Sequence, residues 1–296
     1  MANDDMWKVI KAIPDKRGRP GGLTSFHRPQ IFVQPVVDFL RNLVRRQAVG
    51  RLEFDPASGA MTSLVAKSPP WNVLGGPGNV VAREEDHGDL WELYHNLESG
   101  FVTNKTPHAA PRPGQAVFSS EQAGTRGTVS RGAVFSEFKV THPFGGNNNF
   151  ATTVRLYAGL RRIDIRSQIL NNEKSVRYRV LFPTSIRDGA SYHEIPFGAI
   201  ERPVGIELPA QNWVDYGNGE QGVAVLNRGL PGNNVAEGTM MLSLARSTRI
   251  QAYGYGGGYE PGMSSDTGFE LGKEITFDYA LVPHTGTWRE AGVYRD

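Results

Sequence analysis

From Arg51 onward, apolar residues recur at every second position in short segments separated by glycine and proline. The segment VRYRVLF (176–182) places Val, Tyr, Val and Phe at alternate positions, with arginines at the second and fourth. EITFDYAL (274–281) repeats the pattern with Ile275, Phe277, Tyr279 and Leu281. Because successive side chains of a strand point to opposite faces, each segment predicts a β-strand with one apolar face.

Turn signals connect these segments into antiparallel pairs. LEFDPASGAMTSLVAK (52–67) indicates strand, turn and strand, because DPASG (55–59) contains the residue types that favour chain reversal. In VRLYAGLRRIDIRSQIL (154–170) the alternation slips between Leu160 and Ile163, which predicts a turn or a bulge. Glycine-rich breaks follow at 143–150 and 253–263. The many short strands predict an all-β domain.

The expected architecture is a large two-sheet antiparallel sandwich over residues 49–296, since each sheet must bury its apolar face against another. A single sandwich of this length is common among all-β domains. The 35 glycines and 19 prolines agree with many turns, and an apolar content of 39% is enough for a sizeable core. No internal repeat of fixed period is found.

Residues 1–48 differ from the rest of the chain. A basic start containing KRGRPGG (16–22) is followed by PVVDFLRNLVRRQ (35–47), in which Val36, Val37, Leu40, Leu43 and Val44 share one face at helical spacing. This pattern predicts one short amphipathic helix in a leader segment. The helix packs on protein in the favoured interpretation, because its apolar face is short and lacks aromatic anchors apart from Phe39.

Charge and composition narrow the classes of partner. The chain has 32 basic and 30 acidic residues, which gives a net charge of +2. This small excess of positive charge does not indicate binding to nucleic acid or to an anionic membrane. Cysteine is absent, so disulfides and thiolate metal sites are excluded. No apolar run reaches the roughly 20 residues that cross a bilayer, and the start lacks a secretory signal pattern. We therefore expect a cytoplasmic protein without nucleic-acid or membrane partners.

The acidic segment REEDHGDLWELYH (83–95) is the best metal candidate. Its possible ligands are Glu84, Glu85, Asp86, His87, Asp89 and His95. Their spacing fits neither an HExxH helix nor a calcium loop, so a solvated edge with Leu90 and Trp91 in the core is favoured and no metal site is predicted. No G-x-S-x-G elbow is present, and the glycines of 253–263 match no phosphate loop. Stacking of Tyr253, Tyr255 and Tyr259 on a sugar ring is one interpretation of that loop, and a plain hairpin loop is the favoured one.

His193 and Glu194, within YHEIPFGAIERP (192–203), raise a catalytic hypothesis. A His–Glu pair in a concave β-sandwich has the acid and base needed to open a sugar hemiacetal, as in an aldose epimerase. Adjacent residues of one strand point to opposite faces, however, so both line one pocket only if the strand bulges. A strand end with one residue buried and the other exposed is the favoured interpretation.

Several segments in order resemble the C-terminal β-sandwich region of glycoside hydrolase family 38 α-mannosidases. The resemblance spans about residues 50 to 290 and is carried by LEFDPASGAMTSLVAK (52–67), GNVVAREEDHGDLWEL (78–93), YHEIPFGAIERP (192–203), LPAQNWVDYGNGEQGVAVLNRGLPGNNV (208–235), LSLARS (242–247) and ITFDYALVPHTGTW (275–288). The bacterial branch, with its EEDHGDLWE-like segment, is the most similar. The resemblance implies a sugar-binding sandwich of the galactose mutarotase-like type.

The resemblance also implies which parts of the chemistry lie elsewhere. Family members hydrolyse α-mannosides with retention, using a zinc ion and an aspartate nucleophile in an N-terminal catalytic domain that has no counterpart in this chain. We therefore expect no catalytic residues and no cofactor in this chain, with zinc supplied by the complete enzyme. The ERP segment lies beside the catalytic cleft in family members, which implies substrate contact by Arg202, oriented by Glu201. Asn227 and Arg228 are expected nearby.

The sequence thus predicts the C-terminal domain or fragment of an α-mannosidase-like glycosidase that frames or binds carbohydrate and does not hydrolyse it alone. Its expected partners are an α-mannoside-type carbohydrate and a separate or upstream catalytic domain. Two alternatives stay open at this point. One is a stand-alone sugar epimerase or lyase on a mutarotase-like sandwich, and the other is a structural module that completes a partner catalytic chain.

Overall fold

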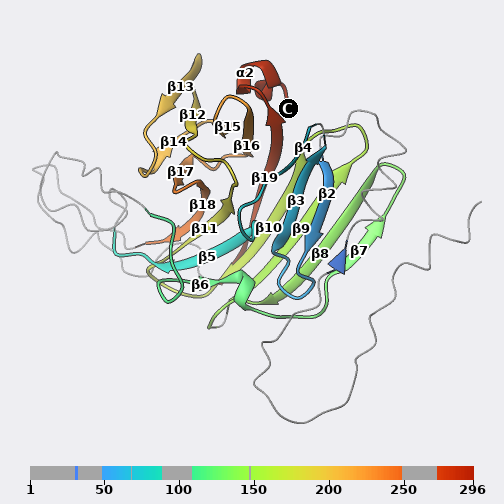
Figure 1. Ribbon diagram of the computed structural model, residues 1–296. Helices are drawn as coiled ribbons and strands as arrows, with labels where there is room; N and C mark the ends of the chain where they lie inside the picture. Colours follow the sequence, from blue (N-terminus) through green and yellow to red (C-terminus); the bar gives the residue numbers. More distant parts are fainter. Residues whose placement is uncertain (1–30, 33–48, 68, 89–108, 147, 249–271) are drawn as a thin grey trace, which may run out of the picture.

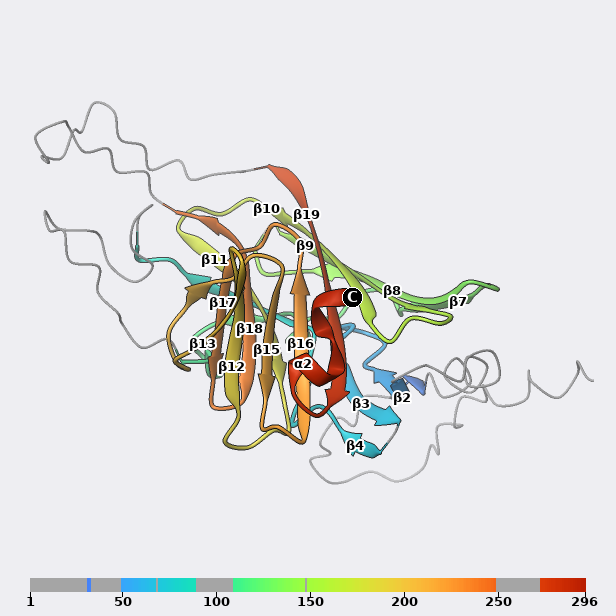
Figure 2. The ribbon, with the colours of Figure 1, turned by 90° about the horizontal axis from the view of Figure 1, so that it is seen from above.

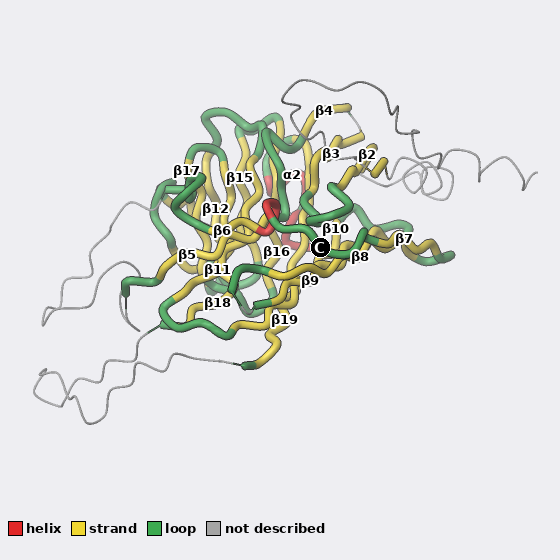
Figure 3. The backbone as a smooth tube through the Cα atoms, turned by 90° about the horizontal axis from the view of Figure 1, so that it is seen from below, coloured by secondary structure: helices red, strands yellow, loops and turns green. Residues whose placement is uncertain are grey.

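The computed structural model describes residues 31–32, 49–67, 69–88, 109–146, 148–248 and 272–296. Strands dominate these residues, and every pair of neighbouring strands in a sheet is antiparallel (Figures 1 and 3). The prediction of an all-β antiparallel sandwich is confirmed. The predicted leader helix at 35–47 lies outside the described residues, as do Tyr253, Tyr255 and Tyr259 of the glycine-rich loop.

The largest sheet includes two of the predicted alternating segments, 154–170 and 274–281, among its nine strands. Their order is β13 (Gly198–Arg202), β12 (Ala190–Ile195), β15 (Trp213–Gly217), β16 (Gln221–Asn227), β19 (Lys273–Thr285), β10 (Ile163–Asn171), β9 (Asn149–Tyr157), β8 (Phe135–Pro143) and β7 (Thr128–Arg131). The slip predicted between Leu160 and Ile163 is the turn from β9 to β10. Strand β19, which has 13 residues, joins the two halves of the sheet, because it pairs with both β10 and β16 (Figure 1).

A six-stranded sheet lies opposite part of the nine-stranded sheet. Its order is β14 (Leu208–Pro209), β17 (Gly232–Ala236), β18 (Thr239–Ser247), β11 (Val176–Pro183), β5 (Val80–Glu85) and β6 (Val117–Phe118). The alternating apolar residues of β11 face the core, as the sequence indicates. The register of β11 with β18 shifts between Tyr178 and Arg179, which marks a bulge.

A third, four-stranded sheet packs against the same core. It consists of β1 (Ile31–Phe32), β2 (Val49–Phe54), β3 (Met61–Lys67) and β4 (Pro70–Asn72). Strand β2 begins at the first residue of the predicted sandwich domain, and β1 adds a strand from the leader. Phe54 stacks on Phe138 of β8 with ring centroids 4.3 Å apart, which anchors this small sheet on the largest one.

The inner faces of the three sheets share one hydrophobic cluster. It includes Phe54 from the small sheet, Ile165 and Leu281 from the nine-stranded sheet, and Val180 and Phe182 from the six-stranded sheet. A short polar chain crosses this core, in which the Tyr279 hydroxyl bonds both Ser167 (2.6 Å) and Asn79 (3.0 Å). Each of these buried polar groups has a hydrogen-bond partner, so the free-energy cost of removing them from water is offset.

The end of the described chain covers part of the outer face of the nine-stranded sheet. Helix α2 (Trp288–Ala291) starts with a capping box of Thr287 and Glu290, and η3 (Val293–Arg295) follows after Gly292 at φ 63°. Trp288 and Val293 pack with Trp213, Ala224 and Val282, so α2 lies against β16 and β19 (Figure 2). The remaining helix is the single 3₁₀ turn η1 (Ser119–Glu121) among the described residues.

A buried ionisable pair lies on the same outer face. His284 Nε2 is 2.7 Å from Asp215 Oδ1, and both side chains are buried. Burial raises the pKa of Asp215, although the contact with His284 opposes that rise. Gly222 is required beneath this pair, because a Cβ atom there would lie 2.2 Å from the His284 ring.

None of the described helices is long and apolar enough to cross a membrane.

Candidate functional site

A groove of about 540 Å³ opens on the outer face of the nine-stranded sheet. Strands β9, β10, β19 and β16 form its floor, and η3 with the residues after it forms one wall. Strand alternation explains the lining, since Asp164 and Arg166 of β10 and Asp278 of β19 face away from the core. The strand patterns therefore place an apolar core and a polar groove on opposite sides of the same sheet.

The centre of the groove is a forked ion pair between two adjacent strands. Arg166 of β10 donates from Nε to Asp278 Oδ1 (2.7 Å) and from Nη2 to Asp278 Oδ2 (2.9 Å). The two residues are direct partners in the β10–β19 register. The hydrogen bond from Arg166 holds the pKa of Asp278 below its ordinary value. This carboxylate is therefore charged and oriented at neutral pH.

Asp164 supplies a second carboxylate, and its pKa is shifted in the opposite direction to that of Asp278. Arg162 Nε donates to its Oδ1 at 2.8 Å. Burial nevertheless raises the pKa of Asp164, because desolvation outweighs the attraction of Arg162, and the nearby charge of Asp278 raises it further. The groove thus holds two carboxylates whose proton affinities are shifted in opposite directions.

The charges of the groove lining balance. Four arginines (Arg155, Arg162, Arg166 and Arg228) stand against four acidic side chains (Asp164, Glu194, Asp278 and Asp296). Aromatic residues Tyr157, Trp213 and Tyr294 also border the groove. Such a surface offers donors, acceptors and aromatic faces without a net charge, which suits a neutral, hydroxyl-rich ligand better than an anion.

The predicted site residues separate into two groups. Asn227 and Arg228 line the groove. In the amide orientation that satisfies its neighbours, the Asn227 nitrogen donates to the Gln211 carbonyl at 2.8 Å. The Arg228 side chain is 85% exposed and lies 4.0 Å from Asp278, so it is free to turn toward a ligand.

Glu201 and Arg202 lie on β13, outside the groove lining. They are adjacent on one strand and therefore point to opposite faces. Glu201 accepts a hydrogen bond from the Tyr192 hydroxyl (3.1 Å) rather than orienting Arg202, and the Arg202 Nε is buried without a partner among the described residues. Their expected contact with substrate stays a prediction.

His193 and Glu194 also lie on opposite faces of β12. His193 is buried on the inner side, where its ring nitrogens contact the Pro209 carbonyl (3.4 Å) and the Ser191 hydroxyl (3.2 Å). Burial lowers its pKa to about 4, so the ring is neutral in the folded protein. Glu194 lines the groove and accepts from the Asn212 backbone at 2.9 Å. The structure thus gives no shared pocket for this pair.

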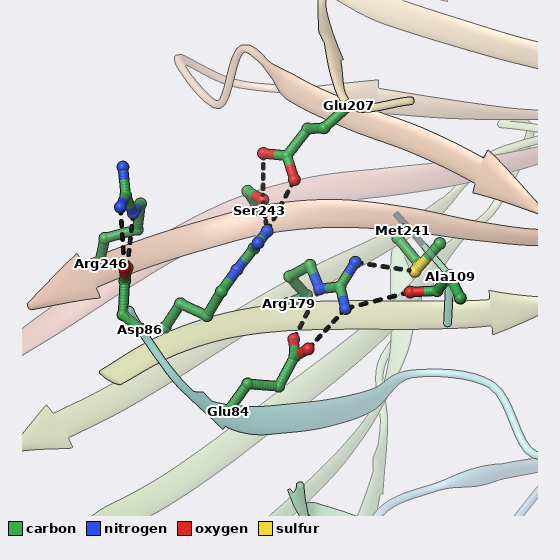
Figure 4. Close-up of polar contacts among 9 residues, drawn as sticks. Glu84, Asp86, Ala109, Arg179, Glu207, Met241, Ser243 and Arg246 are labelled. Atoms are coloured by element: carbon green, nitrogen blue, oxygen red, sulfur yellow. Dashed lines mark hydrogen bonds and ion pairs between the residues drawn. The ribbon is translucent and has the colours of Figure 1, made fainter. Parts of the chain in front are cut away.

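The acidic segment participates in a row of ion pairs on the outer face of the six-stranded sheet (Figure 4). Glu84 accepts two bonds of 2.6 Å from Arg179, and Asp86 accepts two from Arg246, at 2.6 and 2.8 Å. Glu85 and His87 are exposed, and Asp89 and His95 lie outside the described residues. Across the described part of the chain, no three His, Asp or Glu side chains gather where they could hold a metal ion.

Arg177 and Arg179 are both only 1% exposed, although they alternate with the core residues of β11. Arg177 bonds Glu207 (2.6 Å) and Ser243 (3.1 Å), while Arg179 also contacts the Ala109 carbonyl (Figure 4). Sequence alternation indicated their side of the strand and not their burial. Every buried guanidinium here faces a carboxylate, as burial of a charge requires.

Residues 46–252 match the family described as the glycosyl hydrolases family 38 C-terminal domain. The chain belongs to this family. Mouse alpha-mannosidase 2C1 is 27% identical over 254 residues, which are 82% of this chain and 22% of the relative, and the human alpha-mannosidase 2C1 is 26% identical over the same shares. Alpha-mannosidase G of Dictyostelium discoideum is 28% identical over 160 residues. The chain therefore spans about a fifth of the length of the two alpha-mannosidases 2C1.

A solved structure has the same fold. The α-mannosidase from Enterococcus faecalis superposes with a TM-score of 0.65 at 16% identity, over 82% of this chain and 29% of that chain. The predicted relation to the C-terminal region of a family 38 α-mannosidase-like glycosidase is confirmed by the family match and these relatives together. The groove of this family 38 domain was not predicted as a unit, because its walls come from segments more than a hundred residues apart, such as Asp164 and Asp278.

Proposed function

We propose that this family 38 domain frames carbohydrate for an α-mannosidase-type glycosidase and does not hydrolyse α-mannosides by itself. The observation that carries the proposal is the groove: a charge-balanced, aromatic-bordered cavity of about 540 Å³ in a domain whose curated relatives are α-mannosidases. The groove is large enough for one or two sugar rings, since ligand pockets range from roughly 300 to 1,000 Å³. Asp278, held by Arg166, accepts from sugar hydroxyls, and Arg228 donates to them.

We propose that the complete enzyme takes its zinc in its catalytic domain. The described residues of this chain do not fit the ion, because no three His, Asp or Glu side chains gather among them. The His284–Asp215 pair is the closest approach of an imidazole to a carboxylate in the nine-stranded sheet, but it is closed off by burial and lacks a third ligand. No step of the hydrolysis is therefore assigned to this chain.

The binding test uses isothermal titration calorimetry with methyl α-mannopyranoside and an α-linked mannobiose. We expect the wild-type chain to bind, and Asp278→Asn to weaken binding by about tenfold or more, because a charge-assisted hydrogen bond contributes roughly 1.5–3 kcal/mol. Glu85→Gln, at an exposed position outside the groove, is the matched control and should bind as the wild type does. Equal affinity of the Asp278 variant and the control would refute sugar binding in the groove.

The activity test uses 4-nitrophenyl α-mannopyranoside with added zinc. We expect no release of 4-nitrophenol above the buffer rate from the purified chain. Turnover that a chelator abolishes would contradict the proposal, because the chain would then hold a working metal centre of its own.

A further inference from the structure

The aromatic side chains that line the groove differ in how much of each ring a ligand can reach. Trp213 is 4% exposed and Tyr279 is 5% exposed, and the Tyr279 hydroxyl is hydrogen-bonded within the core. The Tyr157 ring packs on Phe135, with ring centroids 5.2 Å apart. Tyr294, by contrast, is 53% exposed and lines the groove. It therefore offers a ligand the most open aromatic surface among these residues.

Two neighbours fix the orientation of the Tyr294 ring without covering it. The Trp288 ring meets it nearly at a right angle (84°), with ring centroids 6.5 Å apart. The Arg295 guanidinium carbon lies 5.2 Å from the centroid of the Tyr294 ring, which is a cation–π distance. Contacts of both kinds favour one arrangement of the ring, yet about half of the side chain stays exposed. Tyr294 is thus an aromatic surface held in position at the groove.

The segment that carries Tyr294 is fastened to the floor of the groove by an arginine in the turn from β9 to β10. Arg161 donates to the backbone carbonyl oxygens of Ala291 (2.5 Å) and Gly292 (3.1 Å). It also donates from Nε to Asp296 Oδ2 (2.7 Å). Because these acceptors lie on both sides of Tyr294 in the chain, one guanidinium fixes the backbone before and after it. Charge-assisted hydrogen bonds of this kind are stronger than neutral ones.

A ring sugar matches such a surface better than an open-chain polyol does. One face of a pyranose presents C–H hydrogens of partial positive charge, and the face of an aromatic ring is negative. The closed ring also has few internal rotations to lose, whereas an open chain with similar hydroxyl groups must be ordered on binding. Hydrogen bonds with Asp278 and Arg228 distinguish the two ligands less, because both ligands present hydroxyl groups.

We propose that Tyr294 is the stacking platform of the groove and makes it select pyranose rings over open-chain polyols, with Arg161 as the positioning residue that holds the platform in place. The inference rests on the proposed function, because it concerns the ligand of the same groove. It assigns selectivity for a ring to Tyr294, whereas the hydroxyl contacts belong to Asp278 and Arg228.

Isothermal titration calorimetry with methyl α-mannopyranoside and with mannitol, the open-chain alditol of mannose, tests the platform. We expect the wild-type chain to bind the pyranoside about tenfold more tightly than mannitol. Tyr294→Ala should weaken pyranoside binding about fivefold and leave mannitol binding unchanged, because only the ring ligand loses a stacking contact. Tyr294→Phe keeps the aromatic ring and should bind both ligands as the wild type does.

Two further variants serve as controls for the platform. Phe197→Ala removes an exposed aromatic side chain from the turn between β12 and β13, outside the groove, and should change neither affinity. Asp278→Asn should weaken both ligands, because both offer hydroxyl groups to that carboxylate. Circular dichroism checks that each variant folds. Equal losses for the two ligands in Tyr294→Ala, or a loss in Tyr294→Phe as large as in Tyr294→Ala, would overturn the stacking role.

A double-variant cycle tests the positioning role of Arg161. Arg161→Gln should weaken pyranoside binding about threefold in the wild-type background and have no effect in the Tyr294→Ala background, because a positioning residue acts only through the residue that it holds. A merely structural role in the wall would lower the affinity for mannitol as well. A further loss of pyranoside affinity in the double variant, or equal losses for the two ligands, would therefore overturn the assignment of Arg161.

The results separate this inference from the proposed function. Failure of the wild-type chain to bind either ligand would overturn both. Pyranoside binding that Asp278→Asn weakens and Tyr294→Ala does not would overturn the platform alone and leave the carbohydrate groove in place.

Discussion

At the scale of single residues, the buried neutral histidine on β12 makes stability depend on pH. The pKa of His193 is lowered to about 4 by burial, against about 6.5 in an unfolded chain. Below pH 6.5 the unfolded state binds the proton more readily than the folded state, so stability is present above that pH and is lost as pH falls toward 4. Between pH 7 and pH 5 we expect His193 to account for about 2 kcal/mol of lost stability.

Urea unfolding of the wild type and His193→Gln at several pH values measures this effect. Carboxylates also titrate in this range, so the difference between the two proteins is the informative quantity. The variant should lose less stability over the window. Parallel pH profiles would show that the His193 ring becomes protonated in the folded state without cost.

At the scale of elements, two similar forked ion pairs differ in burial. Arg179 joins β11 to β5 through Glu84 and is 1% exposed, whereas the Arg166 side chain joins β10 to β19 through Asp278 and is 45% exposed. Removing one partner of a buried pair costs about 3–5 kcal/mol, because the other charge is left in a medium of low polarity. An exposed pair is worth about 1 kcal/mol or less.

We therefore expect Arg179→Ala to lower the free energy of unfolding several times more than Arg166→Ala does. Urea denaturation of both variants in the same buffer checks the ratio. Equal losses would mean that water reaches Glu84 once the guanidinium is gone.

At the scale of the whole molecule, the common core couples the three sheets. Phe54 of the small sheet is buried and stacks on Phe138 of the largest sheet. Phe54→Ala should cost about 3–5 kcal/mol, as buried aromatic truncations do. Because one hydrophobic cluster spans all three sheets, we expect the loss of protection to extend beyond the small sheet.

Hydrogen exchange of backbone amides in β3, β10 and β11 measures how far this loss extends. All three strands should exchange faster in Phe54→Ala under conditions of global unfolding. Faster exchange confined to β3 would show that the four-stranded sheet unfolds independently of the sandwich.

Much of the fold follows from local sequence patterns. Period-two alternation in segments such as VRYRVLF and EITFDYAL determined which residues form strands and which side of each strand faces the core, because side-chain direction in a strand depends only on backbone geometry. Alternation also indicated that His193 and Glu194 diverge, and the structure confirms this. The order of several motifs was enough to indicate family 38, which the family match confirms.

Local patterns could not decide which strands become neighbours. Strand β19 is inserted between β10 and β16, and this pairing alone brings Asp278 to Arg166 and close to Arg228. Glu201 and Arg202 are closer in sequence to Asn227 than Asp164 is, yet they lie outside the groove.

The sequence by itself determined an all-β chain of the family 38 type with an apolar side to each strand. The tertiary structure alone decided that Arg177 and Arg179 are buried, that the groove combines Asp164 with Asp278, and that Phe197 is exposed at a free edge. The physical reason is that alternation is a property of one strand. Burial, pairing and pKa shifts depend on what long-range contacts place against that strand.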